Sequence, residues 1–138
     1  VLAAQGHNPA GAYRAAKELT AWVNRPDWDT ILPAYARCVR ITRDIREIYE
    51  VLPEAFVDPA EEALCQAVRN ARAAERRPGS VDDFLQSFLP MIPAINLFFE
   101  RVLVMDEQPV LRANRLGMLQ MIVSLADGVA DFAQLEGF

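Results

Sequence analysis

The chain has 138 residues, of which 52% are hydrophobic and 24% charged, and its formal net charge at pH 7 is −5. The length is typical of one domain that buries its own core, and the composition excludes an intrinsically disordered chain. No hydrophobic run approaches the ~20 residues of a membrane-spanning helix, and no secretory leader is visible. We therefore expect a cytoplasmic protein with no membrane partner. Because the sequence starts at Val1, we also expect a fragment of a longer protein.

The side chains offer little material for catalysis or metal binding. The single histidine is His7, and Cys38 and Cys65 stand alone among hydrophobic neighbours, as buried thiols do. A structural zinc site takes about four Cys or His ligands, so we expect no metal site. The glycines fit no nucleotide-binding fingerprint, and the acidic pairs lie at expected helix starts or corners. We predict no catalytic residue in this chain.

The first half of the chain predicts three helices. Asn8-Pro9 is typical of a helix start, and Pro26 ends the helix that follows. Asp27 is the expected cap of a longer second helix, whose hydrophobic residues keep a helical period from Trp28 to Tyr49. Asp58-Pro59 predicts the start of a third helix, with acidic residues in its first turn, where they favour the helix dipole.

The second half predicts further helices and no strands. A turn at 77–80 precedes a helix that Ser80 caps, and Pro90 and Pro93 kink or split that helix. A hydrophobic helix is expected over Ile95–Met105, and a last one from Pro109 to about Leu135. The sequence therefore predicts an all-α fold, a single bundle of about five or six helices in one domain over residues 1–138.

Arginine supplies nearly all of the positive charge, because only Lys17 among the 14 basic residues is a lysine. Four arginines follow at intervals of three in the second predicted helix: Arg37, Arg40, Arg43 and Arg46. This spacing drifts by about 60° per step and forms a spiral that could follow a phosphate backbone. Two alternatives remain open, namely a G+C-rich genome that favours arginine codons and a solvated surface paired with neighbouring acids.

Most aromatic residues fall on expected buried faces. Core packing is the predicted role of Trp22, Trp28, Phe84, Phe88, Phe98, Phe99 and Phe132. Tyr35 and Tyr49 share the second predicted helix with the arginine spiral. One of them could offer its ring to an unpaired base, and Tyr35 is the candidate.

The most distinctive segment is 98–116, where a hydrophobic run meets an acidic corner and a new helix starts. It reads Phe98-Phe99-Glu100-Arg101-Val102-Leu103-Val104-Met105 and, after the corner, Arg112-Ala113-Asn114-Arg115-Leu116. This segment resembles the C-terminal region of the β subunit of bacterial glycyl-tRNA synthetases. Similar but less specific stretches are Ala34–Ile41, Phe56–Leu64 and Ala130–Phe132, so the resemblance covers most of the chain from Trp28 on.

The resemblance implies an α-helical anticodon-binding domain of the type shared with arginyl-tRNA synthetases. In that family the α subunit activates glycine, with ATP and Mg²⁺ used outside this fragment, and the β subunit contributes to tRNA binding. The expected partners are therefore glycine tRNA, through its anticodon region, and an α subunit or a fused α region. We expect no DNA partner.

The candidate RNA-contacting residues are Tyr35, Arg37, Arg40, Arg43, Arg112 and Arg115. Asn114 and Arg115 have a competing structural role, in which they tie the acidic corner at Asp106 and Glu107 to the last helix. We favour the structural role for this pair, so the second helix is the first place to look for RNA contacts.

Two other functions also fit the sequence. A helical protein–protein interaction domain would need only the acidic charge and the hydrophobic content. The equivalent domain of another synthetase, with the arginyl enzyme as the nearest, would share the fold and bind a different tRNA.

Overall fold

The computed structural model describes residues 9–129 and 132. This part of the chain contains six α-helices and two short 3₁₀ helices, and none of its residues lies in a β-strand. The elements are α2 (Pro9–Val23), α3 (Trp28–Thr42), η1 (Pro53–Ala55), α4 (Pro59–Ala73), α5 (Val81–Phe88), η2 (Leu89–Met91), α6 (Ile92–Arg101) and α7 (Pro109–Ser124). The predicted all-α bundle is confirmed. Among the described residues, every helix falls short of the length and hydrophobicity that crossing a bilayer requires.

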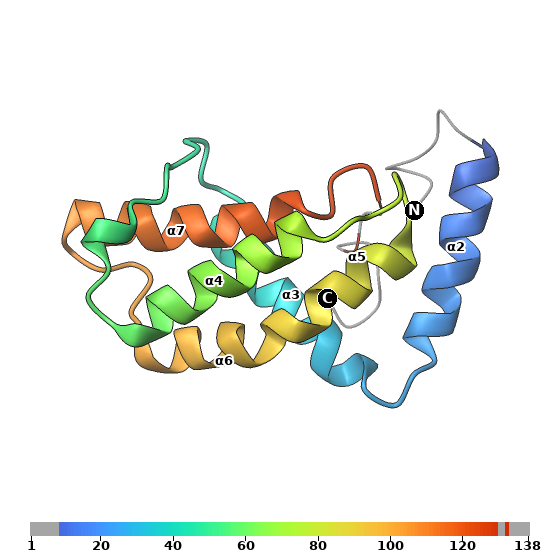
Figure 1. Ribbon diagram of the computed structural model, residues 1–138, viewed down its shortest axis with the longest axis horizontal. Helices are drawn as coiled ribbons and strands as arrows, with labels where there is room; N and C mark the ends of the chain where they lie inside the picture. Colours follow the sequence, from blue (N-terminus) through green and yellow to red (C-terminus); the bar gives the residue numbers. More distant parts are fainter. Residues whose placement is uncertain (1–8, 130–131, 133–138) are drawn as a thin grey trace.

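Helices α4, α6 and α7 run roughly along the long axis of the molecule, and α2 stands across one end (Figure 1). Helix α3 packs against α7, α4 packs against both α6 and α7, and α2 packs against α5. At the other end of the molecule lie η1, the first turns of α4 and α7, and the corner that joins α6 to α7 (Figure 1). The acidic corner of the sequence is therefore also a corner of the bundle.

The core is filled by side chains from all the helices, and its centre is aromatic. The ring of Tyr35 packs edge-on against Phe84, Phe88 and Phe132, with centroid distances of 5.8, 5.8 and 5.4 Å. Edge-to-face pairs of this kind add specific attraction to the burial of the rings. The core role predicted for the tryptophans and phenylalanines is confirmed for all but Phe99, which is only half-buried.

Local start signals account for where several helices begin. Asp58 caps α4 by accepting a hydrogen bond from the Ala60 amide at 2.8 Å, and Glu61 reaches back to the Asp58 amide at 3.0 Å. Ser80 caps α5 by accepting from the Asp83 amide at 3.1 Å. Asp27 precedes α3 as predicted but makes no capping hydrogen bond. Asn8, the expected cap of α2, lies outside the described residues.

The second helix is shorter than predicted, because α3 ends at Thr42 and not at Tyr49. The hydroxyl of Thr42 donates to the carbonyl oxygen of Cys38 at 2.7 Å, within the last turn. Beyond it, residues 43–52 form a loop whose backbone is hydrogen-bonded to side chains of α7. Those long-range bonds replace the helical ones, so hydrophobic periodicity overestimated the length of the helix.

The hydrophobic run after Ile95 also leaves the helical state earlier than predicted. Helix α6 ends at Arg101, and Val102 has extended backbone angles, with φ −122° and ψ 129°. From Val102 to Met105, buried valines alternate with exposed Leu103 and Met105, which is the period of an extended chain. β-Branched valines fit this conformation well, and the extended segment connects the end of α6 to the corner.

The prolines and the last helix follow the prediction in part. Pro90 lies in η2 and Pro93 in the first turn of α6, so the predicted interruption splits the helix in two. Helix α7 starts at Pro109 as predicted but ends at Ser124. Gly128, with φ 75°, takes the left-handed conformation that lets the chain turn after a helix. The expected end near Leu135 lies outside the described residues.

The capping box of α4 gives a first test of this account. Replacing Asp58 with Ala leaves the Ala60 amide without its acceptor, so we expect the free energy of unfolding to fall by about 1 kcal/mol. Urea denaturation followed by circular dichroism measures the change. Glu62→Ala, an exposed acid in the same turn, is the matched control and should change stability by only a few tenths of a kcal/mol. Equal effects of the two changes would contradict the capping role.

Candidate nucleic-acid interface

The predicted arginine spiral is only partly helical. Arg37 and Arg40 are exposed on α3, Arg43 follows the last residue of that helix, and Arg46 lies in the loop 43–52. All four side chains are exposed. We call these four residues the arginine face. The arginine face includes residues of both α3 and the loop. Its four positively charged side chains are accessible to a ligand.

One member of the arginine face is held in place by a ring. The guanidinium carbon of Arg37 lies 4.2 Å from the centroid of the half-buried Phe99 ring on α6. A guanidinium over an aromatic face is attracted by the ring's electrons and lies flat against it. Phe99 therefore limits the positions that Arg37 can take while the side chain stays accessible.

The prediction for Tyr35 is corrected by its position. Its side chain is only 7% exposed, and its ring is packed among three phenylalanines of the core. A ring enclosed in this way has no free face for an unpaired base. Tyr35 projects from the buried side of α3, whereas Arg37 and Arg40 project from the exposed side.

Arg115 is also buried and belongs to an ion pair. Arg115 and Glu61 are 5% and 0% exposed, and both contacts between the guanidinium and the carboxylate measure 3.4 Å. The remaining nitrogen, Nη1, donates to the carbonyl oxygen of Leu103 at 2.8 Å and lies 3.4 Å from Asp106. One arginine thus joins the starts of α4 and α7 to the corner. A side chain in this position is a brace, which is the role that the sequence favoured for Arg115, and its burial does not fit the competing role in RNA contact.

The two oxygens of Glu61 are shared between this ion pair and the cap of α4. Its Oε1 atom accepts from the amides of Val57 and Asp58, at 3.1 and 3.0 Å, and from Arg115. A buried carboxylate is stable only when its lone pairs are satisfied in this way. The acidic first turn of α4 was predicted from the helix dipole alone, which does not account for a fully buried glutamate.

Asn114 holds the loop 43–52 and not the acidic corner. Its Oδ1 atom accepts from the Leu52 amide at 2.6 Å, and its Nδ2 atom donates to the Leu52 carbonyl at 3.0 Å. The corner itself is held by Arg112, which donates to the carbonyl oxygen of Asp106 at 3.0 Å, and by Arg115. Glu107 is exposed and takes no part in these bonds, so its predicted role at the corner is corrected to Asp106.

Two further residues of α7 fix the same loop. The amide side chain of Gln120 accepts from the Tyr49 amide at 3.0 Å and donates to the Glu47 carbonyl at 2.7 Å. Gly117 lies between Asn114 and Gln120, and a Cβ atom there would approach the Tyr49 carbonyl oxygen to 2.9 Å. The loop passes over α7 at this point (Figure 1). Sequence reasoning missed both residues, although Asn114, Gly117 and Gln120 interrupt the hydrophobic pattern of α7 at intervals of three.

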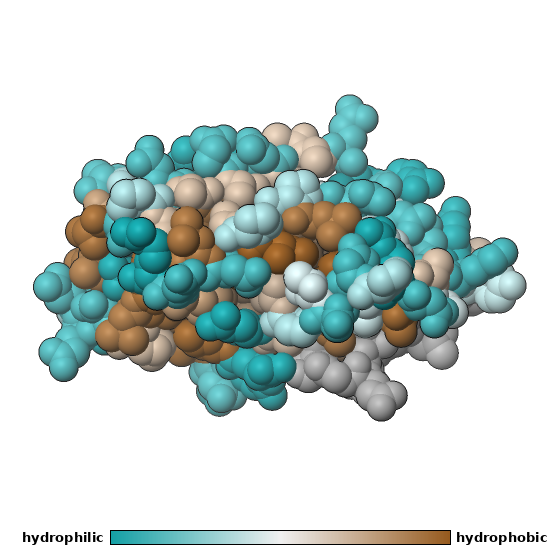
Figure 2. All heavy atoms as spheres, turned by 90° about the horizontal axis from the view of Figure 1, so that it is seen from below, coloured by the Kyte–Doolittle hydropathy of each residue, from teal (hydrophilic) through white to brown (hydrophobic). Residues whose placement is uncertain are grey.

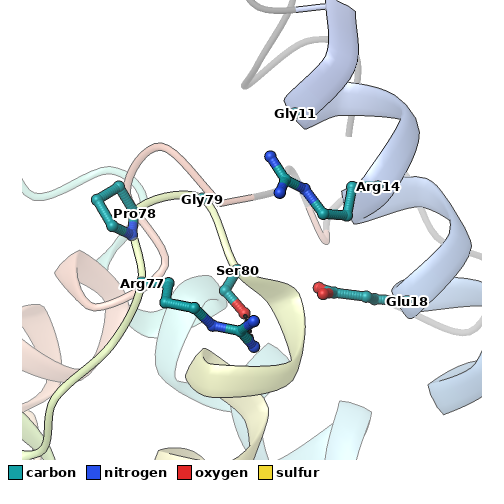
Figure 3. Close-up of a pocket in the computed structure, with 7 residues that line it drawn as sticks. All are labelled: Gly11, Arg14, Glu18, Arg77, Pro78, Gly79 and Ser80. Atoms are coloured by element: carbon teal, nitrogen blue, oxygen red, sulfur yellow. Dashed lines mark hydrogen bonds between the residues drawn. The ribbon is translucent and has the colours of Figure 1, made fainter.

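A cavity of about 250 Å³ lies at the opposite end, between α2 and the turn at 77–80. Arg14 and Glu18 of α2 face this turn, with Glu18 directed toward Ser80 and Arg77 (Figure 3). Glu18 accepts from the Asp82 amide at 3.2 Å, so the start of α5 already has an acceptor. Glu18 is thus used in docking α2 against α5, while Arg77 is paired with Asp83.

Arg77 and Asp83 form an ion pair beside this cavity, with a closest contact of 2.9 Å. Hydrogen bonds from the Arg77 side chain and backbone lower the pKa of Asp83 from 3.8 to about 2. The same pairing raises the pKa of Arg77. In the core, burial raises the pKa of the Cys38 thiol to about 12, which keeps it protonated and unreactive. Cys38 and Cys65 are buried and free, as predicted.

Metal-ligating side chains are dispersed in the structure. Within residues 9–129 and 132, no three Cys, His, Asp or Glu side chains come together in a group that could hold a metal ion. Among the described residues, the arginine face and the loop 43–52 present exposed charged side chains that could contact another molecule.

Comparison with known proteins agrees with the resemblance seen in the sequence. No protein-family model matches the chain. The chain is 33% identical over 137 residues to the glycine–tRNA ligase beta subunit of Moorella thermoacetica, covering 97% of the chain and 20% of that relative. It is 33% identical to the glycine–tRNA ligase beta subunit of Myxococcus xanthus, covering 99% of the chain and 20% of the relative. Nearly all of this chain is thus homologous to part of a glycine–tRNA ligase beta subunit.

A plant relative gives the same result. The glycine–tRNA ligase, chloroplastic/mitochondrial 2, of Arabidopsis thaliana is 32% identical over 140 residues, covering all of this chain and 13% of the relative. The chain therefore spans about a fifth or less of the length of the curated relatives it matches. The similarity covers the chain from end to end, including both the corner and the arginine face.

The buried brace predicts a large loss of stability without Arg115. Arg115→Ala leaves the Glu61 carboxylate buried and without its partner, so we expect unfolding to become easier by about 3–5 kcal/mol. Chemical denaturation measures this loss. The double variant Glu61→Gln with Arg115→Met keeps the capping acceptor, removes both charges and should be less destabilised than Arg115→Ala. A loss below about 0.5 kcal/mol for Arg115→Ala would contradict the brace.

The lowered pKa of Asp83 predicts a pH dependence of stability. Because the folded-state pKa lies below the ordinary value of 3.8, the pair with Arg77 stabilises the fold above about pH 4. That stabilisation is lost as the pH falls toward 2, where the folded carboxylate takes up its proton. We expect Asp83→Asn to lower the melting temperature near neutral pH, and the difference from the wild type to shrink at about pH 2. A difference that stays constant with pH would contradict the shift.

Proposed function

We propose that this chain is the anticodon-binding part of a glycine–tRNA ligase. The observation that carries the proposal is the similarity of nearly the whole chain to glycine–tRNA ligase beta subunits. In this proposal the parent protein attaches glycine to its tRNA, while ATP and Mg²⁺ are bound outside this chain. The chain contributes recognition of the tRNA, and its partners are glycine tRNA and the α subunit or a fused α region.

The arginine face supports RNA as the ligand of this region. Its four guanidinium groups are exposed within ten consecutive residues, on a protein whose net charge is −5. Local concentration of arginine on an otherwise acidic surface favours contact at one place over general attraction to nucleic acid. An anticodon loop is single-stranded, and proteins read such loops through planar hydrogen bonding and stacking, both of which arginine provides.

The burial of Arg115 narrows the choice of contact residues. Of the six residues predicted to contact RNA, Arg37, Arg40 and Arg43 are exposed, whereas Tyr35 and Arg115 are buried. Arg112 is half-buried and is engaged with the corner backbone. We therefore assign the RNA contacts to the arginine face and the identifying segment at 98–116 to the construction of the bundle.

A second candidate, a contact with another protein, is favoured by exposed hydrophobic side chains at the corner. The exposed large hydrophobic residues on η1, the corner and their flanks are Leu52, Val57, Leu103, Met105 and Val110. Hydrophobic residues gather toward this end among hydrophilic ones (Figure 2). Exposed hydrophobic groupings often mark interaction sites. This end, which adjoins the loop 43–52 at Leu52, is where we place the contact with the rest of the synthetase.

Titration of the chain with an RNA stem–loop that carries a glycine anticodon tests the proposal. Binding should weaken with salt by about 0.7 log units per phosphate neutralised for each log unit of salt. Arg40→Ala should weaken binding about five- to hundredfold if Arg40 contacts a base, or lower the salt slope by about 0.7 if it contacts a phosphate. Arg69→Ala, an exposed arginine on α4, is the control and should leave both quantities unchanged.

Two outcomes count against the proposal. If the stem–loop shows no salt-dependent binding, RNA recognition by this chain is wrong and the protein-contact candidate takes its place. If an altered anticodon binds with equal affinity, recognition of glycine tRNA through the anticodon is wrong, although general RNA binding remains.

A further inference from the structure

The loop 43–52 is held on α7 by four hydrogen bonds between its backbone and side chains of the helix. Gln120 bonds the backbone on both sides of Ile48, through the Glu47 carbonyl at 2.7 Å and the Tyr49 amide at 3.0 Å. Asn114 bonds both backbone groups of Leu52, four residues after Ile48, at 2.6 and 3.0 Å. The loop is therefore fixed on either side of Ile48 and at Leu52 by side chains of a helix that is itself part of the core.

Close approach of the two segments adds to this restraint. Gly117 lies between the two amide side chains, and its missing Cβ leaves room for the Tyr49 carbonyl oxygen, 2.9 Å from where that Cβ would be. A glycine in the middle of a helix costs about 1 kcal/mol relative to alanine. Gly117 thus lowers the stability of α7, but it allows the loop to pack closely against the helix.

Ile48 is presented to solvent at the centre of this restraint. Its side chain is 84% exposed, more than that of any other large hydrophobic residue that the structure describes. Single exposed hydrophobic residues are common on protein surfaces, so exposure alone indicates little. Here the backbone on either side of the residue is bonded to the same glutamine, which orders it before any ligand arrives. Such preorganisation lowers the entropic cost of binding.

The charged residues around Ile48 match the groups of an unpaired nucleotide. Arg46 and Arg43 are exposed on the same loop and suit a phosphate or a base edge. The carboxylates of Glu47 and Glu50 are also exposed and can accept hydrogen bonds from the amino group of cytosine. Glycine codons begin with two guanines, so a glycine anticodon carries two cytosines. An isoleucine between these groups offers an apolar surface to the face of a base.

We propose that the loop 43–52 is the base-contacting element of the arginine face, with Ile48 packed against an unpaired anticodon base. Gln120 and Asn114 are positioning residues that act through the loop backbone. The inference rests on the proposed function and adds to it the element that meets the bases. Two of the four exposed arginines of the arginine face, Arg43 and Arg46, lie on this loop, and this favours RNA over a protein as the occupant.

The test compares two exposed hydrophobic residues. Ile48→Ser should raise the dissociation constant for a glycine anticodon stem–loop at least about fivefold, the effect of losing one base contact, without lowering the melting temperature. Val57→Ser is the matched control, since Val57 is 68% exposed and lies outside the loop. Its dissociation constant should stay within about twofold of the wild type. Fluorescence anisotropy with labelled RNA measures both.

A second variant separates positioning from contact. Gln120→Leu keeps Ile48 and releases its two flanks, so we expect faster amide hydrogen exchange at Tyr49 together with weaker RNA binding. Circular dichroism verifies that the helices remain. Adding Ile48→Ser to Gln120→Leu should weaken binding less than Ile48→Ser does in the wild type, because the contact has already been loosened.

The binding results for the wild type and the variants distinguish failure of the inference from failure of the proposed function. If the wild-type chain does not bind the stem–loop, both are wrong. If the wild type binds and Ile48→Ser binds equally well, the proposed function stands and the inference is overturned, which leaves a protein partner as the occupant of Ile48. Weaker binding of Ile48→Ser with an unchanged Val57→Ser supports the inference.

Discussion

The buried pair of Glu61 and Arg115 is the interaction on which the arrangement of this bundle depends. It joins residues 54 positions apart in the sequence, and it adds to them the Leu103 carbonyl and the Asp106 carboxylate of the corner. Two charges removed from water this completely are stable only while each keeps its partners. The start of α4, the end of α6 and the start of α7 are therefore fixed relative to one another. The path of the loop over α7 follows, because the residue before Arg115, Asn114, bonds Leu52.

This constraint separates what identifies the chain from what we propose contacts its ligand. The distinctive segment at 98–116 contributes mostly buried or half-buried groups, which hold the corner and the loop. The exposed cations of α3 and of the loop lie outside that segment. A charged residue that builds the corner cannot be replaced without leaving its buried partner unpaired, whereas an exposed arginine can be replaced without this effect. The need of its buried groups for specific partners explains why the segment is so distinctive and why it need not contact RNA.

Local chemistry made much of the fold predictable. Proline positions and capping side chains act on neighbours within a few residues, so the starts of α4, α5 and α7 could be read from the sequence. Hydrophobic periodicity predicted the helices but overestimated the length of two of them, which end at Thr42 and Arg101. After Thr42 the chain bonds partners far away in the sequence, and after Arg101 the Leu103 carbonyl accepts from Arg115 of the next helix. The bonds from α7 to the loop span 62 to 73 residues. Nothing local in residues 43–52 signals these bonds, and the burial of Glu61 could not be predicted for the same reason. Tyr35, by contrast, lies on the hydrophobic period that predicted the buried side of the second helix.

The central claim is that the corner is structural and that RNA meets α3 and the loop 43–52. Nuclear magnetic resonance of the labelled chain, with a glycine anticodon stem–loop added in steps, tests it most directly. The account predicts that amide shifts change mainly between residues 37 and 50, while those between 103 and 115 stay nearly constant. Changes concentrated between 103 and 115, with α3 and the loop unaffected, would contradict it.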